Sequence, residues 1–267
     1  MAHPTILVSN DDGLHAPGVL ALAQALAELA TVIVVAPERN WSAVGHTKTM
    51  HKPLRAVEVT LAEGIRAFQC SGSPSDCASL GLLGLVGGHV DLVVSGINDG
   101  ANVGSDLLYS GTFAAAAEAA IAGVAAFAVS LDIVPGAGLL RPHGYRTAAR
   151  FAAALARKLL AAPATPPWLL NVNVPDLPEG GGATPPLPNA EVTRLGTRIY
   201  QDALVERLDP RGRRYFWIGG NVPSGVVEAG TDIGALAAGH ISITPVRLDL
   251  TDEGRMEAVR ALVGAGT

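Results

Sequence analysis

The chain has 267 residues, a formal net charge of −5, 49% hydrophobic residues and only 4% aromatic residues. This length suits one large domain, and an interior of Ala, Val, Leu and Gly favours helices packed closely on a parallel sheet over an aromatic-rich β-sandwich. Without a run of Lys and Arg, the chain is not expected to bind a nucleic-acid polymer, and without about 20 consecutive apolar residues it is not expected to span a membrane.

Strands and helices alternate through most of the chain. Strands are predicted at 5–9, 31–36, 65–70, 91–95, 125–130, 168–174 and 241–246, and helices at 19–30, 73–86, 112–122, 145–161 and 252–264. This alternation predicts an α/β fold: a Rossmann-like, doubly wound and mostly parallel sheet with right-handed crossovers.

The alternation breaks after Pro175. Residues 178–188 are rich in Pro and Gly and predict a loop, whereas 191–217 contain strand-like pieces and predict a β-hairpin excursion. We predict one domain over 1–267, with its core at about 1–176 and 240–267 and the excursion at about 190–239.

The two cysteines, Cys70 and Cys77, lack the spacing of a zinc pair or of a CxxC redox motif. No charged segment followed by a long apolar stretch precedes the first strand, so no secretory signal is expected. We therefore expect two reduced thiols in a cytoplasmic protein.

The first chemical motif, Ser9–Gly13, follows the first strand and contains Asn10, Asp11 and Asp12. In a parallel sheet, ligands bind beyond the carboxyl ends of the strands. Two adjacent aspartates repel each other there unless a cation joins them, and carboxylates suit magnesium, manganese or calcium. Gly13 permits the tight turn. The alternative is an Asx-type turn that caps the following helix.

Two further loops offer neutral oxygen atoms. The loop after the strand at 91–95 carries Asn98, Asp99 and Asn102 between glycines. Amide oxygens complete a metal site without adding negative charge. The loop after the strand at 31–36 carries Ser42, a neutral oxygen donor, and His46, which is either an acid or base or simply an exposed residue.

The fourth motif, Tyr109-Ser110-Gly111-Thr112, opens an Ala-rich helix. A helix N-terminus with free backbone N–H groups and neighbouring hydroxyls is suited to an anion such as phosphate. The alternative is that a hydroxyl merely caps the helix. A metal site beside a phosphate site favours metal-assisted phosphoryl transfer to water, and neither a Gly-x-Gly-x-x-Gly nor a Walker-type motif is present.

In order along the chain, ILVSNDDGLHAPG, VVAPERNWSAVGHT, DLVVSGINDGANVG, YSGTFAAAAEAAIAG and TDIGALAAGHISITP resemble the SurE family of survival-protein 5′-nucleotidases. The resemblance implies hydrolysis of nucleoside 5′-monophosphates, with 3′-monophosphates and short polyphosphate as substrates of some members. It implies one divalent cation per subunit, Mg²⁺ or Mn²⁺, held by Asp11, Asp12, Ser42 and Asn98. The chain has Ala43, Ser73 and Phe113 where Gly, Thr and Val are frequent, and no departure removes a ligand.

Our working hypothesis makes Asp11 and Asp12 the catalytic pair. The phosphate and substrate site is assigned to Asn10, Gly13, Asn102, Ser110, Gly111 and Thr112. Either a metal-activated water or a carboxylate of the pair is the nucleophile. A nucleotide-sugar glycosyltransferase-like enzyme and a non-catalytic nucleotide- or phosphate-binding module are the alternatives; the first usually needs a second α/β domain, and the second needs no Asp pair.

The resemblance also implies a homodimer or homotetramer, often built by exchange of C-terminal segments. The excursion carries Arg194, Arg198, Tyr200, Tyr215, Phe216 and Trp217. Aromatic residues and Arg are enriched at interfaces, so we expect an arm that pairs with a neighbouring subunit rather than a hairpin folded on its own core.

Overall fold

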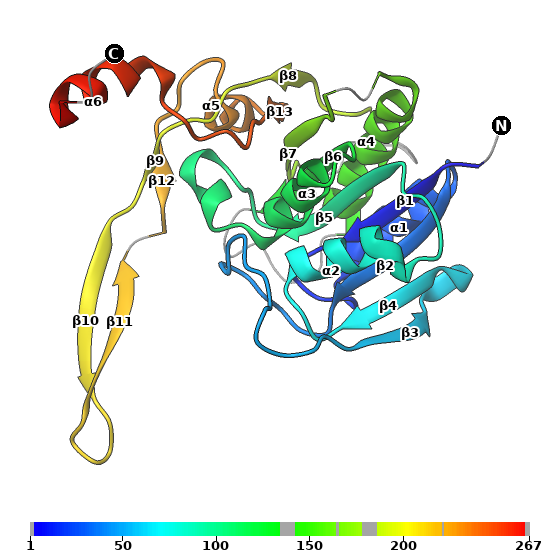
Figure 1. Cartoon of the computed structure of the whole chain (residues 1–267), viewed down its shortest axis with the longest axis horizontal. Helices are drawn as coiled ribbons and strands as arrows, with labels where there is room; N and C mark the ends of the chain where they lie inside the picture. The colour runs from blue at the N-terminus through cyan, green and yellow to red at the C-terminus, as the bar shows by residue number, and fades with distance from the viewer. Residues whose placement is uncertain (1–2, 134–141, 164–165, 178–185, 221, 265–267) are drawn as a thin grey trace.

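The computed structural model describes residues 3–133, 142–163, 166–177, 186–220 and 222–264. Its centre is a nine-stranded sheet in the order β3-β4-β2-β1-β5-β6-β7-β13-β8 (Figure 1). Neighbouring strands are parallel except β3–β4 and β7–β13. The strands of this sheet are β1 (Thr5–Ser9), β2 (Thr31–Pro37), β3 (Ala56–Thr60), β4 (Arg66–Cys70), β5 (Leu92–Asp99), β6 (Ala126–Asp132), β7 (Leu169–Pro175), β8 (Ala190–Val192) and β13 (Ile241–Pro245). The prediction of an α/β fold with a mostly parallel sheet is confirmed.

Helices cover both faces of this sheet. The helices are α1 (Pro17–Ala27), α2 (Pro74–Leu80), α3 (Gly111–Ile121), α4 (Pro142–Ala161), α5 (Asp232–Ala237) and α6 (Met256–Val263). α1 packs against α4 on one face, and α2 packs against α3 on the other. Among the described residues, no helix has the length and apolar character that a membrane span requires.

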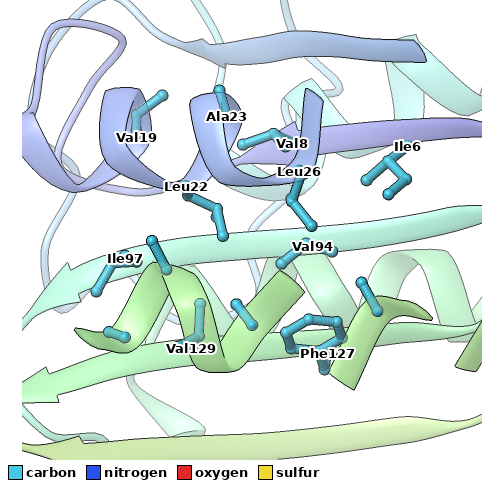
Figure 2. Close-up of a cluster of buried hydrophobic side chains, with 14 of the residues drawn as sticks. Ile6, Val8, Val19, Leu22, Ala23, Leu26, Val94, Ile97, Phe127 and Val129 are labelled. Carbon is cyan, nitrogen blue, oxygen red and sulfur yellow. The ribbon is translucent and has the colours of Figure 1, made fainter. Parts of the chain in front are cut away.

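Two apolar cores flank the sheet because successive side chains of a strand point to opposite faces. Ile6 and Val8 of β1 belong to the core under α1 and α4, together with Leu22 and Phe127, which Figure 2 shows between the helices and the strands. Leu7 belongs to the other core, under α2 and α3. Strands buried on both faces explain the continuous apolar runs in the sequence.

The central strands place their carboxyl ends at one edge. β2, β1, β5, β6 and β7 are adjacent and mutually parallel. The loops after β1, β2 and β5 therefore emerge on the same side of the sheet, where α3 also begins. The fold brings the four polar motifs of the sequence to this edge.

Several elements differ from the predicted ones. β3 was missed because its side chains are mostly exposed and its sequence lacks a long apolar run. The helix expected at 73–86 ends at Leu80 and continues as one wide turn (Gly81–Leu85), in which Gly84 has a φ of 118°. β5 continues to Asp99, beyond the predicted end at residue 95.

The C-terminal third contains two short antiparallel pairs. β10 (Asp202–Leu208) and β11 (Arg214–Gly220) form a hairpin that projects away from the sheet, and β9 (Arg198–Ile199) pairs with β12 (Ser224–Gly225) at its base (Figure 1). α6 has no buried residue and lies away from the sheet. Its helical conformation was predicted, but its separation from the core was not.

The boundaries of the excursion also differ from the expected ones. β8 belongs to the central sheet, and the short helix α5, which was not predicted, packs on β13 and β7. Residues 178–185 of the predicted loop lie outside the described residues. The assignment of the whole chain to one domain stays a prediction.

Candidate active site

Asp11 lies just beyond β1 and is nearly fully buried, with 3% of its surface exposed. The Thr112 hydroxyl at the start of α3 donates a hydrogen bond to Asp11 Oδ1. Burial raises the pKa of Asp11, although hydrogen bonds from Thr112 and Gly111 oppose this shift. Gly111 permits the close approach, because a Cβ at that position would lie 2.8 Å from the Asp11 Cβ.

Asp12 is held by the loop after β2 and by the last residue of β5. Asn40 Nδ2 donates to its Oδ1 at 3.1 Å, and the backbone N–H of Asp99 donates to its Oδ2 at 3.2 Å. Burial, and then repulsion by Asp11, raise the pKa of Asp12 to about 6. Two neighbouring carboxylates with raised pKa values form a site that favours either protons or a cation.

The first loop is shaped by Asn10 and Gly13 rather than by the aspartates. Asn10 is buried, and its Nδ2 donates to the Gly13 carbonyl at 3.0 Å. Gly13 adopts a φ of 101°, which permits the turn. Helix α1 begins at Pro17 after Ala16, and no side chain caps it. The alternative in which the Asp-Asp pair caps this helix is therefore wrong.

Asn98 reaches the site because β5 is irregular. The register with β6 shifts between Gly96 and Asn98, as at a β-bulge, which re-aims the side chains that follow. Asn98 Nδ2 donates to the Gly100 carbonyl at 2.6 Å, which leaves Oδ1 3.3 Å from the Thr112 hydroxyl. The amide oxygen therefore lies on the side of Asp11.

Asn102 is anchored to β6 and β7. Its Nδ2 donates to the Ser130 hydroxyl at 2.9 Å, and its backbone carbonyl accepts from the amides of Asn171 and Asn173. These bonds fix the loop after β5 at the edge of the sheet.

The predicted residues converge on one cleft of about 290 Å³. Asp11, Ser42, Asn98, Asn102 and Ser110 all line it. Ser42 is exposed in the loop after β2, and its backbone N–H donates to Asn40 Oδ1 at 2.8 Å. Three of the four expected metal ligands thus share the cleft with two of the expected phosphate ligands.

Ser110, at the start of α3, both caps the helix and lines the cleft. Ser110 is the N-cap, and its hydroxyl accepts from the Phe113 backbone N–H at 3.0 Å. The capping alternative is therefore correct for Ser110, although its hydroxyl hydrogen remains available as a donor toward the cleft. Thr112 is fully buried and contacts Asp11, so it positions that carboxylate instead of facing the cleft.

Several residues near the site gave no clear signal in the sequence. Asn40 supports Asp12, and the Tyr145 hydroxyl donates to Asp99 at 3.2 Å. Glu118 is a buried carboxylate in the Ala-rich helix α3 and pairs with His46. In the sequence, the one signal for Glu118 was its position as a single acidic residue within a run of alanines. The His46 side chain therefore contacts Glu118 and does not line the cleft.

Comparisons with known proteins identify the family of this chain. The family model for the survival protein SurE matches residues 6–202. The chain belongs to the SurE family. It is 50% identical over 249 residues to the 5′-nucleotidase SurE of Herpetosiphon aurantiacus, covering 92% of this chain and 93% of that protein. It is 49% identical over 251 residues to the same-named protein of Geobacter sulfurreducens, covering 92% and 89%.

A solved structure has the same fold. The crystal structure of the SurE protein from Aquifex aeolicus matches with a TM-score of 0.77 and 33% sequence identity. The match covers 97% of this chain and all of that chain (100%). The agreement therefore extends over the central sheet and the C-terminal third.

Proposed function

We propose that this SurE-family 5′-nucleotidase binds one divalent cation, Mg²⁺ or Mn²⁺, and hydrolyses nucleoside 5′-monophosphates to nucleoside and phosphate. Asp11, Asp12, Ser42 and Asn98 hold the cation in this proposal. When bound, the cation supplies Lewis-acid stabilisation of the negative charge on the phosphate oxygens. The identity of 49–50% to two 5′-nucleotidases argues against the glycosyltransferase alternative.

The observation that carries the proposal is the gathering of oxygen atoms around Thr112. Its hydroxyl lies within hydrogen-bond distance of both Asp11 Oδ1 and Asn98 Oδ1. A hydroxyl has one hydrogen, so it satisfies only one acceptor at a time. With Asp12 adjacent and repelled by Asp11, the cluster has more acceptors than donors, which suits a hard cation.

The donor set has two carboxylates and two neutral oxygens. The described part of the chain contains no group of three or more His, Cys, Asp or Glu side chains arranged to hold a metal. Two carboxylates with a hydroxyl and an amide fit Mg²⁺ or Mn²⁺ better than zinc, which prefers nitrogen and sulfur ligands.

The chain's own groups orient the substrate. Asn102, Ser110 and the first turn of α3 face the phosphate in this proposal, because Asn102 and Ser110 line the cleft and the helix start presents backbone N–H groups. Gly111 and Thr112 hold Asp11 in place, and Asn10 and Gly13 shape its loop.

The test is phosphate release from a panel of nucleoside 5′- and 3′-monophosphates with Mg²⁺, with Mn²⁺ and with EDTA. We expect release from the 5′-monophosphates that depends on the metal and stops in EDTA. Binding of mononucleotides without any release would favour the non-catalytic module instead. Release that is unaffected by EDTA would contradict the metal site.

The C-terminal third supports a homodimer or homotetramer. The β10–β11 hairpin exposes Phe216, Trp217 and Ile218, and α6 exposes Leu262 and Val263. Apolar side chains exposed on elements that lie away from the central sheet are typical of an interface. Light scattering at micromolar concentration tests this; a stable monomer would contradict it. The cytoplasmic location and the lack of a nucleic-acid polymer among the partners stay predictions.

A further inference from the structure

A buried carboxylate outside the cleft is bound by two different segments. Glu118 of α3 is only 6% exposed. His46 Nε2 lies 2.9 Å from its Oε2, Lys48 Nζ forms an ion pair with its Oε1, and the Ser79 hydroxyl donates to the same Oε1 at 2.8 Å. Burial raises the pKa of Glu118, but the bonds from Lys48, His46 and Ser79 outweigh this and leave the pKa below its usual value. Glu118 is therefore ionised at neutral pH.

Glu118 lies too far from the chemistry to contact a substrate. It follows the N-cap Ser110 by eight residues on the same helix, or about 12 Å at the rise of an α-helix. It is also absent from the lining of the cleft. Any role in the reaction must act through the residues that it holds.

His46 and Lys48 belong to the segment 41–49, which we name the strap. At its first end, the Trp41 backbone N–H donates to the Asp11 carbonyl at 2.7 Å. Near its other end, Thr49 donates to Asp76 of α2 through its backbone N–H at 2.9 Å and its hydroxyl at 2.7 Å. Ser42, which lines the cleft, lies between these anchors.

The strap depends on these anchors for its position. It contains no helix or strand, and most of its residues are exposed or half-buried. Segments with few buried apolar contacts open at low free-energy cost unless polar contacts hold them. Two parts of the strap contact α3 or the residue just before it. The Gly45 N–H donates to the Tyr109 carbonyl at 2.9 Å, and the side chains of His46 and Lys48 both contact Glu118.

We propose that Glu118 is a positioning residue, which fixes the strap to α3 and so holds Ser42 at the cation site formed with Asp11, Asp12 and Asn98. This inference rests on the proposed function. Groups that orient metal ligands typically change metal affinity by about 10- to 100-fold when removed. Asp11, Asp12 and the start of α3 do not depend on Glu118, so the reaction at saturating metal is expected to persist.

The experiment measures Mn²⁺ binding without substrate, by electron paramagnetic resonance or calorimetry, for the wild type and Glu118→Gln. We expect the Mn²⁺ dissociation constant to rise about 10-fold. The kcat at saturating Mn²⁺ should stay within about threefold of the wild type, because only the neutral ligand Ser42 is displaced. Glu191→Gln is the matched control: Glu191 also pairs with a histidine, His240, at the far edge of the sheet. It should bind Mn²⁺ as the wild type does.

Two further variants separate the outcomes. Lys48→Gln alters a half-exposed side chain, so it tests the same contact even if Glu118→Gln does not fold. It should also weaken Mn²⁺ binding, and the double variant should lose little more than either single variant. Additive losses, or wild-type affinity in both single variants, would overturn the positioning role. Equal Mn²⁺ binding by the wild type and Asp11→Asn would instead overturn the proposed function.

Discussion

The cleft at the carboxyl edge and the C-terminal arm (residues 198–225 and 247–264) differ in how their side chains are satisfied. At the cleft, polar groups are buried and bound within one chain: Asp11 contacts Thr112, and Asp12 contacts Asn40. On the arm, apolar groups are exposed: Trp217 is 64% exposed and Leu262 is 84% exposed.

The contrast between buried polar groups at the cleft and exposed apolar groups on the arm suggests a different binding partner for each region. Under the proposed function, the excess of acceptor oxygens at the cleft binds a cation, and the exposed apolar surface of the arm contacts a second protein surface. This proposal assigns chemistry and assembly to separate parts of the chain, so changes in one region should leave the other largely intact.

The largest effect should come from the carboxylate pair. Asp11→Asn or Asp12→Asn removes one negative ligand, so hydrolysis at a fixed Mn²⁺ concentration should fall by about 10³-fold or more, as expected when charge stabilisation in the transition state is lost. Asp91→Asn, at the opposite end of β5, is the control. Steady-state kinetics with Mn²⁺ titration measures the effect. Full activity of either site variant with metal present would refute the assignment.

A change in the arm should alter assembly but not chemistry. Trp217→Ser removes a large exposed aromatic side chain from the hairpin. Trp is enriched among the few interface residues whose truncation costs about 2 kcal/mol or more, roughly 30-fold in affinity. Light scattering across a dilution series should show dissociation at higher protein concentration. The rate per active site should remain near that of the wild type. A loss of activity without any change in mass would show that the two regions are not separate.

The pH dependence of stability should report on Asp12. In EDTA, its pKa rises from 3.8 to about 6 on folding, so the folded state holds the proton more tightly than the unfolded state. The free energy of unfolding should therefore fall as the pH rises from about 4 to 7. Solvent screening of the half-buried carboxyl limits the fall to about 1–2 kcal/mol.

Asp12→Asn isolates this contribution, because the other titrating groups remain. Urea unfolding at several pH values should show the wild type losing more stability than the variant over this interval. Mn²⁺ at pH 7.5 should restore the wild type and not the variant. Parallel pH profiles for the two proteins would contradict this account.

The sequence predicted those parts of the fold that depend on local pattern. Apolar runs located the central strands. The family resemblance gave the expected metal ligands, of which Asp11, Ser42 and Asn98 line one cleft; their role as ligands stays a prediction. The re-aiming of Asn98 by the irregularity in β5 and the buried Glu118 pair depend on contacts between segments distant in sequence. The detachment of α6 was also missed, because an amphipathic pattern shows that a helix has an apolar face but not which surface covers it.

The smallest expected effect concerns the strap. Ala43 adopts a φ of 59°, the left-handed region, where an L-residue costs about 1–2 kcal/mol. Ala43→Gly relieves this strain but adds about 0.5–1 kcal/mol of chain entropy to the unfolded state. The free energy of unfolding should therefore change little or rise by up to about 1.5 kcal/mol. Ala101→Gly, in the same cleft but without a positive φ, should be destabilising. Equal destabilisation by both variants in urea unfolding would show that Ala43 is not strained.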